Sequence, residues 1–433
     1  MQRNVSQLLR SPVDWPNSSV DNQVLQRHIE RAIRAPRVEM TNRYWGVGCT
    51  RMVLVIIPRL VGMDSSILCA LAADLSSPVS GRRRIGESFV TELSLRRWIP
   101  VISFENIIEL FQHRNAQTVN SRVSMFAKLP QIAHIDSVQH PGFPGSIADV
   151  LAREVRAFLS AKTSDVFSVA ESARSRLFAF CGGRKIANWL RRDMAVLWPL
   201  AQQDHARNKF LSSVSHIDIM RAGNKKIGKL RADDRVDRAA IARHRASLTK
   251  HMKTELRARG VKGVGHDAFA EQFALGSEAR LLAIAGPKGH CTVGEFVNKS
   301  LRSNGIDPAQ VNGNTTVNEI AALTGFSHKL KVVSRALGLH RPVTPSEIPI
   351  DKCPSEIVQS GIERRRRSAP RAQSGDLIDS NLSVLACYCD ITIVDKRTNE
   401  YIRQLRMQNG VANALIRKVV CLSKYVDLLS EKF

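Results

Sequence analysis

Short β-prone segments that alternate with helical segments lie near both ends of this 433-residue chain and are scarce in its middle. The alternation runs from 51 to 136 and returns between 373 and 433. This spacing is typical of a parallel sheet flanked by helices. We therefore predict an α/β fold that is interrupted by a mostly α-helical insertion over residues 137–372. Residues 1–50 show little periodicity and are interpreted as an N-terminal extension, part of which could precede the native start.

The individual elements follow from hydrophobic periodicity and from the local breaks in it. The expected strands are Val53–Ile57, Ile99–Ser103, Gln131–Ile135, Asp390–Asp395 and Lys418–Leu422. The expected helices around the sheet are Ser66–Ala73, Gly81–Arg97, Glu105–His113, Gly375–Ala386 and Thr398–Arg406. The helices expected in the insertion are Ile147–Ser160, Val166–Phe180, Ala187–Ala201, Arg235–Gly260 and Ala268–Ala285.

The charge balance of the chain is strongly positive. Its 64 Lys and Arg residues outnumber 39 Asp and Glu residues, which gives a formal net charge of +25. Such an excess predicts binding to a polyanion, most simply a nucleic acid, through phosphate contacts and counterion release. An anionic membrane surface would fit the charge alone, but a membrane-spanning segment is not expected. The longest apolar stretch, Met52–Ile57, is far shorter than the roughly 20 residues that a spanning helix needs.

The eight cysteines are scattered and form no CxxC pair, so neither a zinc site nor a redox motif is indicated. In a chain of this size they are interpreted as reduced core thiols, which makes the cytoplasm the expected location. The sequence is also compatible with a protein partner and with a homo-oligomer.

Four acidic residues stand where strands are expected to end or helices to begin: Asp64, Glu109, Asp376 and Asp395. Glu105 lies one turn before Glu109, and Asp379 lies one turn after Asp376. Ligands of an open α/β sheet gather at the carboxyl ends of its strands, so all of these side chains could converge there. Clustered carboxylates require neutralising cations, and hard oxygen ligands favour Mg²⁺ or Mn²⁺.

Each acid also has a purely structural interpretation. Asp64, Asp376 and Asp395 could be ordinary helix N-caps. Glu105 stands in the first turn of a helix, where an acid interacts favourably with the helix dipole. Glu109 is surrounded by apolar residues and is harder to explain as a solvated position. The order of the acids along the chain, taken together, favours a shared site.

The motifs around these acids resemble the PIN-like nuclease fold, which is related to the flap endonucleases. The resemblance is carried by Met63–Leu68, Pro100–Glu109, Gly375–Asp379 and Asp390–Lys396. It covers residues 51–136 and 373–433, about a third of the chain. The second acid could be Glu105 instead of Glu109, and the third could be Asp379 instead of Asp376.

The resemblance implies metal-dependent hydrolysis of phosphodiester bonds, with RNA as the first substrate to expect. A toxin or defence role is common in the family, and for a toxin the expected protein partner is an antitoxin. It implies Asp64, Glu109, Asp376 and Asp395 as catalytic and metal-binding residues, with Glu105 and Asp379 as alternates or outer ligands. Inactive members are also known. The alternative is therefore a non-catalytic nucleic-acid-binding or regulatory protein that keeps the fold.

Two basic segments are candidates for phosphate contact. The first is the stretch Arg221–Lys262, which includes Lys225, Lys226 and Lys229 and could equally be a solvated helix face. Within it, Gly223–Leu230 mimics a P-loop but ends in Leu where Ser or Thr is needed, so nucleotide binding is not expected. The second is the run Arg364, Arg365, Arg366 and Arg367, which could clamp substrate phosphates or form an exposed linker.

The segment Thr316–Leu339 could be a helix-turn-helix with its turn at Gly325, which would place a second helix in a DNA groove. Lys331 occupies a position that is usually apolar in that motif. Two packed helices of the insertion are therefore the favoured interpretation.

Overall fold

A central β-sheet organises the protein, whose computed structural model describes residues 58–161, 165–203, 226–229, 235–258, 265–286, 290–368 and 381–431. Six strands form this sheet in the order β4-β3-β2-β1-β7-β8. They are β1 (Arg59–Gly62), β2 (Trp98–Ile102), β3 (Ile132–Ile135), β4 (Phe178–Cys181), β7 (Ile391–Ile393) and β8 (Lys418–Val420). All pairings are parallel except that of β3 with β4. The predicted α/β class is confirmed, and the sheet is mixed instead of wholly parallel.

The strand that leads into Asp64 is β1, whereas the predicted strand Val53–Ile57 lies outside the described residues. Parallel pairing on both sides places β1 at the centre of the sheet, between β2 and β7. Gly62 makes this close approach possible. A Cβ atom there would lie 3.3 Å from Cys389 Sγ and 3.4 Å from the Thr392 side chain. The N-terminal and C-terminal parts of the chain thus meet in one sheet.

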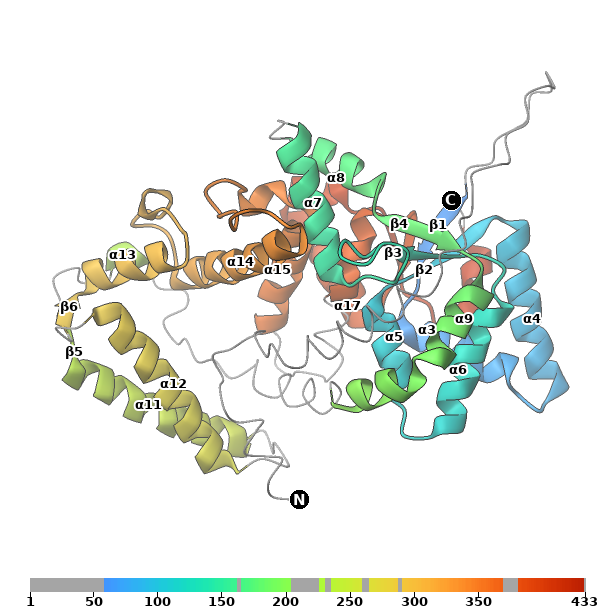
Figure 1. The fold of residues 1–433 in the computed structure, drawn as a ribbon, viewed down its shortest axis with the longest axis horizontal. Coiled ribbons are helices and arrows are strands. Elements are labelled where there is room, and N and C mark those ends of the chain that lie inside the picture. Colours follow the sequence, from blue (N-terminus) through green and yellow to red (C-terminus); the bar gives the residue numbers. More distant parts are fainter. Residues whose placement is uncertain are drawn as a thin grey trace.

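Helices cover both faces of the sheet (Figure 1). One face, lined by Val61 and Ile102, packs against a set of helices and a closing 3-10 turn. They include α3 (Ser65–Leu75), α4 (Ser80–Leu95), α5 (Phe104–Phe111), α6 (Ala116–Lys128), α9 (Gly183–Arg192), the helical residues 194–203 and η5 (Tyr425–Ser430). The other face, lined by Leu60 and Val101, packs against a second set. These are α7 (Ile147–Ala161), α8 (Val166–Arg174), α15 (Pro354–Ser368), η4 (Ser383–Cys387), α17 (Lys396–Gln408) and α18 (Gly410–Leu415).

The beginning of the predicted insertion takes part in this α/β architecture. The helix expected at Val166–Phe180 ends at Arg174, and its last residues form β4. Phe178 and Phe180 are β-prone aromatic residues, and pairing with β3 overrides the helical pattern. The helix α9 approaches α6 so closely that a Cβ atom at Gly183 would lie 2.0 Å from Phe126 O. Residues 165–203 therefore belong structurally with the sheet.

The helices between 235 and 325 extend away from the sheet and are called the helical arm below (Figure 1). The arm contains a two-stranded sheet of β5 (Arg235–Asp237) and β6 (His290–Thr292). Its helices are α11 (Arg238–Ala258), α12 (His266–Ala285), α13 (Val293–Ser303) and the first part of α14 (Val317–Ala336). The second part of α14 packs on α7 through Phe326, Leu330 and Val333.

The predicted turn at Gly325 is wrong, because α14 is one continuous helix from Val317 to Ala336. Gly325 faces open space, so a glycine there interrupts no packing and leaves the helical hydrogen bonds in place. Thr316 and Glu319 form a capping box at the start of this helix. The helix-turn-helix interpretation is therefore excluded for this segment. None of the described helices is both long enough and apolar enough to cross a bilayer.

Candidate functional site

Three of the predicted acids follow the carboxyl ends of β1, β2 and β7. Asp64 caps α3, and its Oδ1 accepts a hydrogen bond from Ser66 N at 2.7 Å. Asp395 caps α17 and accepts hydrogen bonds from Thr398 N at 2.8 Å and Thr398 Oγ at 2.9 Å. Glu109 lies on α5, directly after β2. The N-cap interpretation is thus correct for both aspartates, and capping leaves acceptor capacity on each carboxylate.

The same acids interact electrostatically with one another. Burial raises the pKa of Asp64, hydrogen bonds from Ser66 oppose this shift, and the charge of Asp395 adds to it. Burial also raises the pKa of Glu109 to about 7, against a hydrogen bond from Ser65 and with added repulsion from Asp64 and Glu105. The charge of Asp64 therefore interacts with that of Glu109, from the first part of the α/β fold, and with that of Asp395, from the second part.

Glu105 stands one turn before Glu109 and connects α5 to α7. Its Oε1 accepts a hydrogen bond from Ile147 N at 2.9 Å. Its Oε2 is buried and lies outside hydrogen-bonding geometry with every residue that the structure describes. Burial raises the pKa of this carboxyl group. A buried carboxylate oxygen without a partner is costly, so a proton or a cation at Glu105 would be stabilising.

A buried asparagine that the sequence analysis did not single out joins these elements. Asn106 Nδ2 donates to Met63 O at 3.2 Å and to Ser65 Oγ at 2.9 Å. Its Oδ1 accepts from Ser103 N at 3.0 Å and from Ser103 Oγ at 3.2 Å. The spacing of Ser103 and Asn106 is that of a capping box, which could have identified the helix start. Nothing in the sequence indicates the bonds of Asn106 to the end of β1.

The four described acids, Asp64, Glu105, Glu109 and Asp395, fit a hard divalent cation chemically, because each offers carboxylate oxygens. The remaining predicted ligands, Asp376 and Asp379, lie outside the described residues. Within the described ranges, no group of three or more His, Cys, Asp or Glu side chains is close enough together to hold a metal ion. In the described geometry, Asp64 and Asp395 point into their caps rather than into a closed cage of ligands.

The arginine run is not an exposed linker, since residues 364–366 form the last turns of α15. Arg364 is exposed, whereas Arg366 is buried. Arg365 donates to Gly361 O at 2.6 Å and to Gln404 O at 3.3 Å. The side chain of Arg367 lies outside the described residues. Arg364 is therefore the described member of the run best placed to meet a phosphate.

The predicted lysines lie on a different part of the molecule, beside the helical arm. Lys226 Nζ donates to Asn314 Oδ1 at 3.2 Å, and Lys229 is exposed at the end of a 3-10 turn, Ile227–Lys229. Lys225 lies outside the described residues. Lys226 and Lys229 are both exposed, so their ammonium groups could contact a polyanion.

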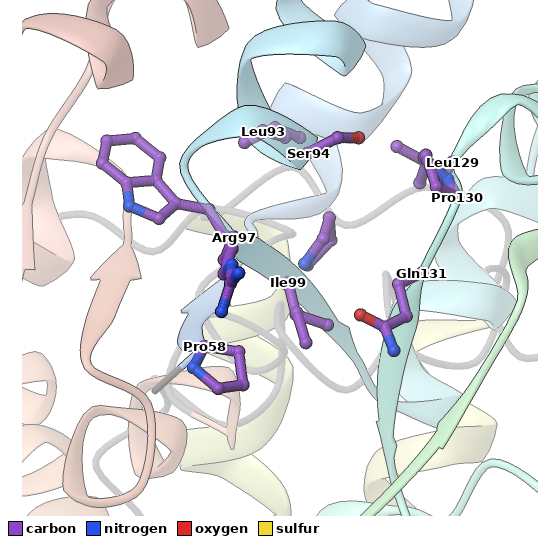
Figure 2. A pocket seen from close by; sticks show the side chains of 10 residues that line it. Pro58, Leu93, Ser94, Arg97, Ile99, Leu129, Pro130 and Gln131 are labelled. Carbon is purple, nitrogen blue, oxygen red and sulfur yellow. The ribbon is translucent and has the colours of Figure 1, made fainter. Parts of the chain in front are cut away.

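A hollow of about 320 Å³ lies at the opposite edge of the sheet from the acids. Its lining includes Pro58, Arg97 and Gln131, next to the amino ends of β1, β2 and β3, and no carboxylate is among its lining residues (Figure 2). The acidic group and this hollow are therefore separate features of the same sheet.

Comparison with known proteins gives no relative for this chain: no family model, no curated protein and no solved structure matches it. The functional assignment therefore depends on the residues and on their arrangement.

Proposed function

We propose that the protein is a metal-dependent nuclease with a PIN-like α/β domain, and that it acts as an endoribonuclease. The observation that supports this most directly is the placement of Asp64, Glu109 and Asp395 at one edge of the sheet, where the charge of Asp64 raises the pKa of Glu109 and the charge of Asp395 raises that of Asp64. These residues come from three separate segments and follow three neighbouring strands. A carboxylate that only caps a helix does not need a second carboxylate nearby. A cation site does, because it needs several carboxylates close enough for their charges to act on one ion.

In this proposal Asp64, Glu109 and Asp395 hold Mg²⁺ or Mn²⁺, together with Asp376 and with Glu105 or Asp379 as outer ligands. When bound, such a cation supplies an activated water and stabilises charge on the phosphate. The protein contributes orientation and proton binding. The carboxyl group of Glu109, with a pKa of about 7, can take up or release a proton near neutral pH.

The net charge of +25 supports a nucleic acid as the substrate class. RNA is the substrate that the PIN-like resemblance implies, and a toxin or defence effector is the corresponding biological role. Arg364 and Lys229 are exposed cations that would contact substrate phosphates. Such contacts would place the nucleic acid without selecting a base sequence.

The test is cleavage of labelled RNA and DNA in the presence of Mg²⁺, Mn²⁺ or EDTA, with a double variant, Asp64→Asn with Asp395→Asn. We expect cleavage of RNA by the wild type with either metal and a loss of more than about 100-fold in the double variant, since metal ligands contribute several kcal/mol to such reactions. Asp165→Asn is the matched control, because Asp165 caps α8 in the same way at an exposed position. Equal cleavage by the double variant and the wild type would end the proposal.

A non-catalytic nucleic-acid-binding protein is the second candidate. It is favoured by the use of Asp64 and Asp395 as caps and by the lack of a ready-made metal cage among the described residues. This candidate predicts RNA binding that weakens with salt but is unaffected by EDTA, without cleavage under any metal condition. The same cleavage assay therefore separates the two candidates.

A further inference from the structure

The amide of Asn106 is the most completely bonded polar group beside the acids. The residue is fully buried, and both Nδ2 and Oδ1 make two hydrogen bonds each. The two bonds of Oδ1 stay within the start of α5, at Ser103. The two bonds of Nδ2 leave the helix and reach Met63 and Ser65, which flank Asp64 on either side. One side chain of α5 thus fixes the backbone position of Asp64.

The bond to Ser65 has a second consequence. Ser65 Oγ accepts the hydrogen of Asn106 Nδ2, so its own proton is directed to another acceptor. Ser65 also lowers the pKa of Glu109, which stands one turn after Asn106 on α5. Ser65 therefore links the end of β1 to the helix that follows β2 and carries both side chains.

We propose that Asn106 is a positioning residue that, through its bonds to Met63 and Ser65, holds Asp64 against α5, the helix that carries Glu109, and so sets the affinity of the site for a divalent cation. This inference rests on the proposed function, because it assigns Asn106 a part in the same site. A purely structural asparagine would need only the capping-box bonds to Ser103. The bonds of Nδ2 add an orientation that a metal-binding carboxylate requires from its surroundings.

The test is a double-mutant cycle of Asn106→Ala and Ser65→Ala, with Mn²⁺ binding measured by electron paramagnetic resonance and the Mn²⁺ dependence of RNA cleavage measured in parallel. We expect each single variant to weaken Mn²⁺ binding by about 10–100-fold, the range typical for residues that orient metal ligands. The double variant should be no weaker than Asn106→Ala alone, because Ser65→Ala breaks a bond that Asn106→Ala already removes. Saturating Mn²⁺ should restore most of the cleavage rate.

Asn409→Ala is the matched control, since Asn409 is an N-cap asparagine that accepts a bond from Ala412 N at the start of α18, outside this site. If Asn106→Ala does not fold, as judged by thermal unfolding, Asn106→Ser takes its place, because serine keeps a small polar group at this position but removes the amide that bonds Met63 and Ser65. A folded Asn106 variant with wild-type Mn²⁺ affinity would overturn the inference, and so would losses that multiply in the double variant. Wild-type protein that binds Mn²⁺ without cleaving RNA or DNA would instead end the proposed function alone.

Discussion

The α/β part and the helical arm are stabilised by different kinds of interaction. In the α/β part, two extensive cores cover the faces of the sheet. Buried polar side chains of this part, such as Asn106 and Glu154, are hydrogen-bonded to neighbouring elements. The arm is held by two small clusters, around Met252 and Ile241, and by surface ion pairs such as Arg245 with Glu278 at 2.8 Å. A buried apolar side chain contributes about 1.5–3 kcal/mol, whereas an exposed ion pair contributes about 0–1 kcal/mol.

This difference bears on function. The acids lie in the part whose backbone is fixed from several directions, as a site that must hold side chains in place requires. Three of the six Lys and Arg residues on α11 are paired with acids of α12: Arg245, Lys253 and Arg257. These three cations are therefore less available to a polyanion than their number in the sequence indicates.

The largest effect should follow from breaking the polar junction of α7, α15 and η4. Glu154 is completely buried and accepts hydrogen bonds from Ser355 N at 2.8 Å, Ser355 Oγ at 2.6 Å and the Tyr388 hydroxyl. Glu154→Ala leaves three buried donors without an acceptor. We expect the free energy of unfolding of the α/β part to fall by about 3–5 kcal/mol, measured by urea denaturation.

The control for this junction is Glu171→Ala, at an exposed position of α8, which should change the free energy of unfolding by less than about 0.5 kcal/mol. Similar small losses for Glu154→Ala and Glu171→Ala would show that the junction does not stabilise the α/β part.

The junction also shows which features the sequence could predict. Hydrophobic periodicity predicted α3 and α5 to within two residues at their starts, and Asp64 was already a candidate N-cap. The sheet rule predicted that Asp64 and Asp395 lie at the carboxyl ends of strands, and the pairing of β1 with β7 makes those strands neighbours. The partners of Glu154 come from elements far away in the chain, and no local pattern indicates such pairs. The bonds of Asn106 to β1 and the pairing of β4 with β3 were missed for the same reason.

A smaller effect is expected from pH, and it should also distinguish the two regions. The pKa values of Glu109 and Glu154, both in the α/β part, are raised to about 7 by burial. In the unfolded chain a glutamate titrates near pH ~4.3. Between these two pKa values the folded protein keeps protons that the unfolded chain releases. The free energy of unfolding is therefore highest below pH ~4.3 and falls as the pH rises towards 7. For Glu154 alone the loss approaches about 3 kcal/mol.

The measurement is urea denaturation without metal at pH 5 and pH 7.5, with hydrogen exchange to follow each region. Exchange in the α/β part should accelerate more than exchange in the arm at the higher pH, after correction for the intrinsic rate. Glu154→Gln should flatten the dependence, since glutamine does not titrate. Stability of the wild type that increases over this pH range would contradict the assignment of raised pKa values.

The smallest effect should come from the surface ion pair of the arm. Arg245→Ala removes the ion-pair partner of Glu278. The side chain of Arg245 is 45% exposed, so water and salt already screen the pair. We expect less than about 1 kcal/mol of lost stability, confined to hydrogen exchange in α11 and α12. In a cycle with Glu278→Ala, the coupling energy should decrease as salt is added. A loss of several kcal/mol, or faster exchange in β1 and β2, would mean that the arm and the sheet unfold as one unit and that the contrast between them is wrong.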